Sequence, residues 1–179
     1  MSEMQTLYTL CYPNLAEADR QFIDEFRRKH DIPFRDVVAP HFTMVYGCSD
    51  VPLSAYRQHV AEIARSQTVI NFTLRYAMLG NDDSNNNYYV FLVPDEGYSG
   101  ISKLHDKLYQ GPLTSYLRLD IPYVPHIGIA TIPDAPHIRT LCNQLNSKGV
   151  DIHGQINSIT VCSYDGSKIT DLESFLCKK

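Results

Sequence analysis

The chain has 179 residues, of which 44% are hydrophobic and 20% are charged, and its formal net charge is −4. This composition is typical of a globular protein of one domain or of two closely packed halves, and it excludes a disordered chain. The negative charge argues against long duplex nucleic acid as a partner, because a phosphate backbone is held mainly by Lys and Arg. A small nucleotide or an RNA terminus needs only a few donors, so the charge does not exclude either as a partner.

Cysteine usage and hydropathy favour a cytoplasmic protein. The five cysteines are widely spaced, without the Cys-x-x-Cys pair that would indicate a zinc or redox site, so we expect reduced thiols. The first six residues lack the basic and apolar stretches of a signal peptide, and no apolar run approaches the ~20 residues that cross a bilayer. We therefore expect a cytoplasmic location, no membrane partner and a monomer.

Strands and helices alternate in each half of the chain. Asn14 with Glu17 is typical of a helix capping box, Pro52 suits a first helical turn, and Asp165-Gly166 suits a hairpin turn. In the first half, strand, helix, strand, helix and strand are predicted over about 7–12, 14–31, 41–46, 52–64 and 69–79. After a polar loop at 80–87, the second half repeats this order over about 88–93, 101–108, 123–132, 134–149 and 153–164, followed by a strand at 168–175.

A Pro-His pair opens the second strand of each half, at Pro40-His41 and Pro125-His126. If a pseudo-two-fold axis relates the halves, these strands lie side by side and the histidines converge. Strand alternation places Thr43 and Val45 on the face of His41, with Gly128 and Ala130 on the face of His126.

Two histidines on opposite sides of one phosphorus suit a metal-free in-line displacement. One neutral imidazole removes a proton from the attacking oxygen, and the other, as imidazolium, protonates the departing oxygen. The unperturbed histidine pKa of ~6.5 suits both tasks. The Thr43 hydroxyl can donate to a nonbridging phosphate oxygen. We predict His41 and His126 as catalytic residues and Thr43 as a phosphate-binding residue, with no metal ion or other cofactor.

With these residues, the sequence resembles the two-histidine (2H) phosphoesterase superfamily, which includes 2′-5′ RNA ligase-like proteins and cyclic nucleotide phosphodiesterases. Its signature is a duplicated His-x-Thr/Ser-x motif; 41–44 matches it fully, whereas 126–129 has Gly128 at the phosphate-binding position of the hydroxyl residue. The resemblance implies a bilobal, duplicated α+β fold in one domain, residues 1–179, with half-repeats of about 1–80 and 88–179. Two antiparallel-rich sheets would line a central groove, with helices packed outside.

Gly128 allows two interpretations. Losing one hydrogen bond to a transition-state anion costs on the order of 10² to 10³ in rate, unless a backbone N–H, a water or another side chain replaces it. Thr131 is the nearest hydroxyl, but strand alternation places it on the wrong face unless a bulge intervenes. Alternatively, the glycine makes room for a bulkier substrate.

Four more residues are candidates for substrate binding. Tyr12 and Tyr123 could stack a nucleobase, and packing in the core or at the rim is the alternative. Arg35 and Arg118 precede the two histidines by six and eight residues, so each could reach a second phosphate from a loop. Solvent exposure is the alternative for both arginines.

Together, the motifs and the resemblance predict a metal-independent phosphodiesterase. Its substrate would be a 2′,3′-cyclic nucleotide, a cyclic phosphate derived from ADP-ribose or an RNA terminus. One alternative is a noncatalytic nucleotide or RNA-end binding module with a degenerate second motif. The other is 2′-5′ RNA ligase-like activity, which calls for a basic RNA track that the composition does not show. Because the site is nearly symmetric, either histidine could be the base.

Overall fold

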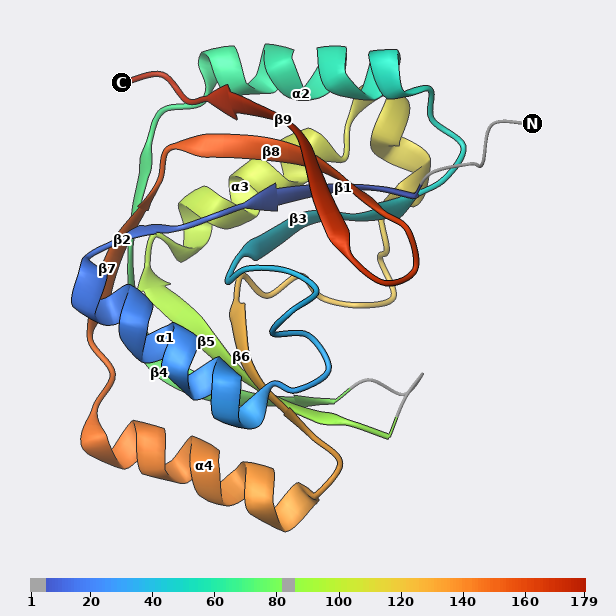
Figure 1. Cartoon of the computed structure of the whole chain (residues 1–179). Coiled ribbons are helices and arrows are strands. Elements are labelled where there is room, and N and C mark those ends of the chain that lie inside the picture. Colours follow the sequence, from blue (N-terminus) through green and yellow to red (C-terminus); the bar gives the residue numbers. More distant parts are fainter. Residues whose placement is uncertain (1–5, 82–85) are drawn as a thin grey trace.

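The computed structural model describes residues 6–81 and 86–179 (Figure 1). Residues 1–5 and, within the predicted polar loop, residues 82–85 lie outside the described residues. In chain order the elements are β1 (Thr6–Cys11), β2 (Asn14–Leu15), α1 (Glu17–His30), β3 (Phe42–Cys48), α2 (Leu53–Ser66), β4 (Ile70–Asn81), β5 (Tyr88–Glu96), α3 (Tyr98–Leu108), the 3-10 helix η1 (Gly111–Tyr116), β6 (Ile127–Ile132), α4 (Ala135–Lys148), β7 (Ile152–Ile156), β8 (Ser158–Tyr164) and β9 (Ile169–Leu176).

The strands form two antiparallel sheets, so the predicted α+β class is confirmed. Sheet A has the order β3-β1-β8-β9, and sheet B has the order β2-β7-β4-β5-β6. Each sheet takes strands from both halves of the chain, so the two lobes do not coincide with the sequence halves. The motif strands β3 and β6 are edge strands of different sheets and are not paired side by side, contrary to our expectation.

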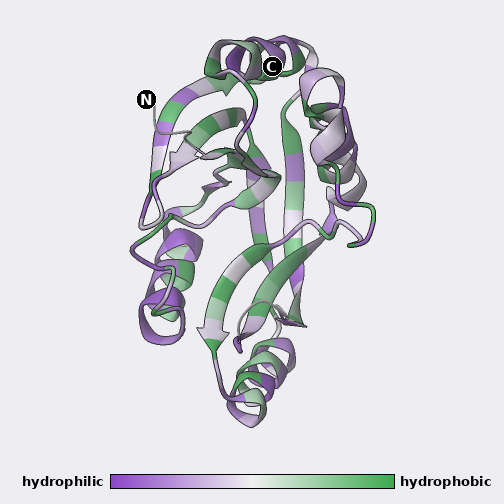
Figure 2. Cartoon of the chain, turned by 90° about the vertical axis from the view of Figure 1, so that its right-hand side faces the viewer, coloured by the Kyte–Doolittle hydropathy of each residue, from purple (hydrophilic) through white to green (hydrophobic). Residues whose placement is uncertain are grey.

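Helices cover the sheets from outside and fill the space between them. In sheet A, α2 packs on β8 and β9, and in sheet B α4 packs on β4, β5 and β6. On the opposite side of sheet B, α1 lies against β6, while α3 contacts strands of both sheets. The helices at the top and bottom of Figure 2 have hydrophilic and hydrophobic residues on opposite sides, as their sequence periodicity predicts.

Three predicted boundaries are wrong for identifiable reasons. Asn14 does not cap α1, because Asn14 and Leu15 pair with β7; the helix begins after Ala16, without a side-chain cap. The strand predicted from 123 begins only at Ile127, since Pro125 lies within the preceding residues and cannot donate to a sheet ladder. The strand predicted at 153–164 is two strands, β7 in sheet B and β8 in sheet A.

The cap predicted for α4 is confirmed. Asp134 caps α4, because its carboxylate accepts the backbone N–H of His137 at 2.9 Å. All five cysteines are free and buried, in agreement with the expected reduced thiols. Among the residues that the structure describes, no helix is long and apolar enough to span a membrane.

Candidate active site

His41 lies immediately before β3, and its ring is oriented by its own loop. The Nδ1 atom is 2.7 Å from the carbonyl oxygen of Ala39. Because a carbonyl only accepts, Nδ1 carries the proton and Nε2 is the basic nitrogen of the neutral ring. The Thr43 hydroxyl lies 3.1 Å from Nε2 and donates to it in that state. The first motif therefore forms a preassembled imidazole–hydroxyl pair.

His126 lies immediately before β6 and repeats this arrangement on its Nδ1 side. Its Nδ1 is 2.6 Å from the carbonyl oxygen of Val124, so the second ring has the same tautomer as the first. The Phe91 ring packs against the imidazole, with 4.0 Å between ring centroids. Within the described part of the chain, no side chain hydrogen-bonds to Nε2, because Gly128 stands where the first motif has Thr43.

The pKa values of both histidines are lowered, although both rings are only partly buried by surface exposure. Burial lowers the pKa of His126, and it is also the main reason why the pKa of His41 falls to about 4. The positive charges of Arg27 and His126 lower the pKa of His41 further, against a raising effect of the hydrogen bond to Ala39. The two imidazoles are therefore close enough to interact electrostatically.

Bulges in both motif strands change the predicted alternation. Along β3, Leu10 pairs with Thr43 and Thr9 with Val45, so Met44 is an extra residue and Val45 turns into the core. Along β6, the extra residue is Ile129, because Phe91 pairs with Gly128 and Val90 with Ala130. Val45 and Ala130 are both buried, contrary to the prediction that they share a face with the histidines.

The bulge at Ile129 moves Thr131 to the face of Gly128, where it pairs with Tyr89. Its hydroxyl is nevertheless committed, because it donates to the carboxylate of Asp31 at 2.7 Å in a buried position. A Cβ atom at Gly128 would lie 3.9 Å from the Phe91 ring, which is ordinary contact. The second motif therefore has space for a side chain but no hydroxyl in that space.

The structure places the two predicted tyrosines beside the motifs. The Tyr12 ring contacts the His41 ring edge-on, with centroids 6.5 Å apart, and its hydroxyl donates to Asp171 at 2.6 Å. The Tyr123 ring stacks on His105, with centroids 3.7 Å apart. Its hydroxyl donates to the carbonyl oxygen of Thr43 at 3.2 Å. Tyr123 thus links the segment before His126 to the strand that carries the first motif.

The two predicted arginines have partners away from the histidines. Arg35 forms an ion pair with Asp36 at 3.2 Å and donates to the carbonyl oxygen of Arg28. Arg118 is exposed and forms an ion pair with Asp120. Neither guanidinium contacts His41 or His126 among the interactions of the described residues, so the structure does not bring these arginines together with the pair.

Replacing Tyr123 by Phe is expected to lower kcat by about tenfold with little change in KM, because small displacements of catalytic groups are costly. The free energy of unfolding should fall by about 1 kcal/mol, the usual value of one hydrogen bond. Steady-state kinetics and thermal unfolding measure both effects. Tyr116→Phe is the matched control, since it also removes a hydroxyl bonded to the backbone, at Asp50. Equal kcat values in the two variants would argue against a link between the motifs.

Sequence reasoning missed three residues near the pair. Arg27 and Asp31 form a buried ion pair, and Phe91 packs on His126. Spacing of four residues within a helix usually indicates an exposed pair, so nothing in the sequence marked Arg27 and Asp31 as buried. In the sequence, Phe91 is one of several apolar residues in the strand predicted at 88–93, and nothing distinguished it from the others. Across residues 6–81 and 86–179, no group of three His, Cys, Asp or Glu side chains could hold a metal ion.

The candidate site therefore consists of two histidines, each oriented by a backbone carbonyl and each preceding an edge strand of a different sheet in an α+β fold. The family model described as the 2′-5′ RNA ligase superfamily matches residues 14–168. The chain therefore belongs to the 2′-5′ RNA ligase superfamily, within the 2H phosphoesterases. No curated protein sequence matches it.

Solved structures show the same fold. Apo LigT of Escherichia coli is 19% identical with a TM-score of 0.64, and the match covers 99% of this chain and 100% of that one. TT0787 of Thermus thermophilus is 17% identical with a TM-score of 0.60, covering 96% and 97%. Usb1 of Kluyveromyces marxianus is only 7% identical, with a TM-score of 0.59 and coverage of 94% and 98%.

Proposed function

We propose that the protein is a metal-independent phosphodiesterase that opens a 2′,3′-cyclic phosphate on a small nucleotide or an RNA end. The observation that carries this proposal is the paired arrangement of His41 and His126. Each ring donates its Nδ1 proton to a carbonyl two residues earlier, which leaves Nε2 for proton transfer. Membership of the family implies an enzyme of the phosphoesterase or ligase type, and the specific reaction is our proposal.

The electrostatics of the pair support an assignment of roles. Burial and the charge of Arg27 lower the pKa of His41, whereas the pKa of His126 is lowered by burial alone, so we assign the proton shared by the pair to His126. His41 is then the base that takes a proton from water through Nε2. The water oxygen forms a bond to phosphorus, one ribose oxygen leaves, and His126 gives its Nε2 proton to that oxygen. The product carries a phosphate monoester on one of the two ribose oxygens and a free hydroxyl at the other position.

Thr43 has two partners in this sequence of events. In the free protein its hydroxyl donates to Nε2 of His41 and occupies the lone pair that must accept the proton. When the phosphate binds, rotation about one bond moves the hydroxyl to a nonbridging oxygen. This rotation frees the base and stabilises the charge at phosphorus in one movement.

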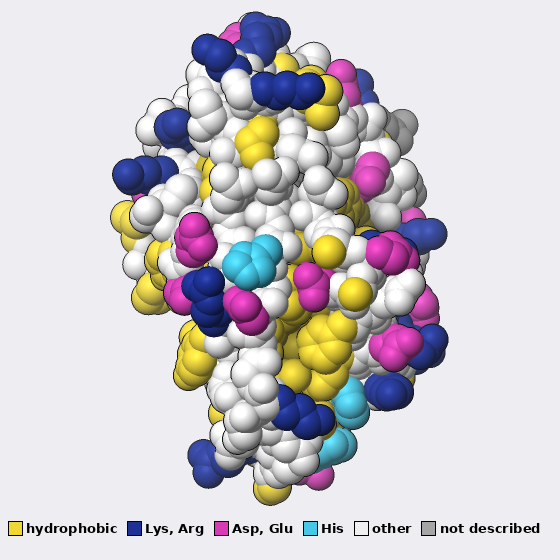
Figure 3. Space-filling model, turned by 90° about the vertical axis from the view of Figure 1, so that its left-hand side faces the viewer, with side chains coloured by type: hydrophobic (Ala, Val, Ile, Leu, Met, Phe, Trp, Pro, Cys, Tyr) yellow, Lys and Arg dark blue, Asp and Glu magenta, His cyan; other side chains and the backbone are white. Residues whose placement is uncertain are grey.

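Charge and the structural neighbours favour a small substrate. On the face shown in Figure 3, Lys and Arg are interspersed with Asp and Glu over most of the surface, and the residues described there form no continuous basic strip. LigT of Escherichia coli has been crystallised with 3′-AMP, with ATP and with NADP+. These complexes support nucleotide-sized ligands for the fold, and we extend this to the present chain as part of the proposal.

A noncatalytic nucleotide or RNA-end binding module is the second candidate. Gly128 favours it, because the second motif lacks a hydroxyl and Thr131 is held by Asp31. RNA 2′-5′ ligation is a third activity suggested by the family name, and the net charge of −4 speaks against the basic track that it needs.

The test is incubation of the purified protein, with chelator present, with the four 2′,3′-cyclic nucleotides and an RNA that ends in a cyclic phosphate. Turnover that is lost in both His41→Ala and His126→Ala supports the phosphodiesterase. Binding of the nucleotides by the wild type without turnover supports the module instead. Joining of RNA ends would support the ligase.

The pH dependence of kcat/KM follows from the lowered pKa values. Activity requires neutral His41 and protonated His126 in the free protein. The rate should fall below pH 4, where His41 becomes protonated, and it should fall again as the pH rises through the lowered pKa of His126. We expect an optimum below the usual histidine value of ~6.5. Measurement of kcat/KM across the acid and neutral range checks this, and an optimum above neutrality would contradict it.

A further inference from the structure

Arg27 is the only Lys or Arg among the described residues that is buried, with 5% of its surface exposed. It belongs to α1, and its Nε donates to the carboxylate of Asp31 at 2.9 Å. One Nη2 proton goes to the carbonyl oxygen of Phe34 at 3.1 Å. A charge in such a position is costly unless it is paired, so the fold specifies the location of this guanidinium closely.

The contacts of Arg27 connect it to the segments that carry both motifs. Asp31 also accepts the hydroxyl of Thr131 at 2.7 Å, and Thr131 follows Gly128 on the same face of β6 because of the bulge. Phe34 belongs to the loop that leads to His41, and its ring stacks on Tyr89 with centroids 6.5 Å apart. The guanidinium is therefore held between the first-motif loop and the second-motif strand.

In the ion pair of Arg27 and Asp31, both oxygens of the carboxylate are hydrogen-bonded, whereas only some N–H groups of the guanidinium are. Both carboxylate oxygens of Asp31 are used, one by Arg27 and the other by Thr131. An arginine has five N–H donors, and three of those of Arg27 have no protein partner within the described part of the chain.

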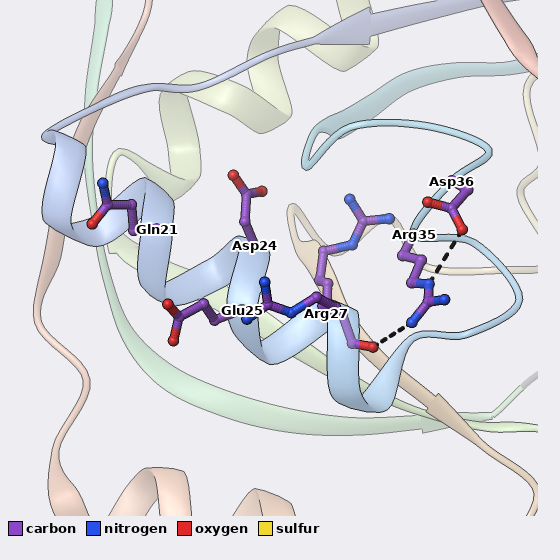
Figure 4. Close-up of a pocket in the computed structure, with 7 residues that line it drawn as sticks. Gln21, Asp24, Glu25, Arg27, Arg35 and Asp36 are labelled. Atoms are coloured by element: carbon purple, nitrogen blue, oxygen red, sulfur yellow. Dashed lines mark hydrogen bonds and ion pairs between the residues drawn. The ribbon is translucent and has the colours of Figure 1, made fainter.

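Two observations describe the surroundings of the guanidinium. Arg27 lines a cavity of about 510 Å³ between α1 and the following loop, where Arg35 bonds to Asp36 and to the backbone of α1 (Figure 4). Its charge also reaches the first histidine, because Arg27 lowers the pKa of His41 more than His126 does. The cavity is not lined by His41, Thr43 or His126, so the guanidinium is linked to the motifs by the hydrogen bond from Thr131 to Asp31 and by its effect on His41.

We propose that Arg27 binds a nonbridging oxygen of the substrate phosphate, as a cationic donor in place of the hydroxyl that Gly128 lacks. Thr43 would hold one such oxygen from sheet A, and Arg27 would hold the other from the side of β6. The ligand class is a phosphate monoester or a cyclic phosphodiester. This inference rests on the proposed function for the identity of the reaction, but the binding of phosphate is testable without it.

The binding test uses inorganic phosphate and isothermal titration calorimetry. The main variant is Arg27→Met/Asp31→Asn, because Arg27→Met alone would leave the Asp31 carboxylate buried without its charged partner. Arg27→Lys keeps the charge without the planar group. Arg28→Met is the matched control, since Arg28 is the next residue of α1 and lines the same cavity. Thermal unfolding confirms that each variant is folded.

We expect the double variant to bind phosphate at least about tenfold more weakly than the wild type, as the loss of a charge-assisted hydrogen bond implies. Arg27→Lys should lie between them, and Arg28→Met should bind like the wild type. Phosphate binding by the folded double variant within about twofold of the wild type overturns the proposal, and so does an equal loss in Arg28→Met.

Kinetics separate this proposal from the proposed function. If the wild type opens no cyclic phosphate but binds phosphate through Arg27, the proposed function fails and the assignment of Arg27 stands. If turnover depends on both histidines but is unchanged in the double variant, the assignment of Arg27 fails and the proposed function stands.

Discussion

Replacing either His41 or His126 by Ala is expected to lower kcat by about 10² to 10⁴, the usual contribution of a general acid or base. Each ring performs a proton transfer that the other cannot perform in the same step. A double variant should therefore be little slower than either single variant, because residues that act as a unit lose their effect together. Single-turnover measurements on a 2′,3′-cyclic nucleotide, with chelator present, give the rate of the chemical step.

Two controls make this result specific. His153→Ala removes an exposed imidazole from β7, so it should leave kcat unchanged. Circular dichroism and thermal unfolding of the two catalytic variants establish that the fold is kept. Metal-dependent turnover that survives in both variants would contradict the two-histidine mechanism.

Thr43→Val has the second-largest expected effect, a loss of about 10² to 10³ in kcat, because one hydrogen bond to the developing charge at phosphorus is removed. Valine has the shape of threonine and is likewise β-branched, so β3 should keep its register. Since the hydroxyl also bonds Nε2 of His41, imidazole NMR of the variant shows whether the ring has kept its tautomer.

The control for Thr43 is Thr170→Val, at an exposed position of β9. It makes the same chemical change in a strand of the same sheet, and its kcat should equal that of the wild type. A loss of less than about threefold in Thr43→Val would mean that the hydroxyl serves only to orient His41 in the free protein.

The local chemistry of the first motif could be predicted from the sequence, because His41 and Thr43 are two residues apart and their contact needs no distant element. The same holds for α4, whose cap follows from Asp134 and whose buried face follows from the periodicity of its apolar residues. The bulges at Met44 and Ile129 could not be predicted, since each depends on the register with a neighbouring strand. The family resemblance supplied the α+β class, but not the mixing of both halves in each sheet.

Arg27 shows a further limit of prediction from sequence. Its spacing from Asp31 is that of many exposed helix pairs, and burial becomes evident only when β6 and the loop before His41 are in place. For Tyr123, the sequence predicted a role that its contacts in the structure do not favour. Its position before the second histidine marked it for base stacking, whereas His105, which is distant from the motif in sequence, occupies one face of its ring.

The position of β1 in the middle of sheet A has a consequence for biosynthesis. One edge of β1 pairs with β3 early in the chain, but the other edge pairs with β8, at residues 158–164. During synthesis on the ribosome, β1 can therefore form its second row of hydrogen bonds only after residues 158–164 have been made. Such distant pairing slows folding. A chain that ends before β8 would leave β1, the neighbour of the strand that follows His41, with an open edge that is prone to aggregation.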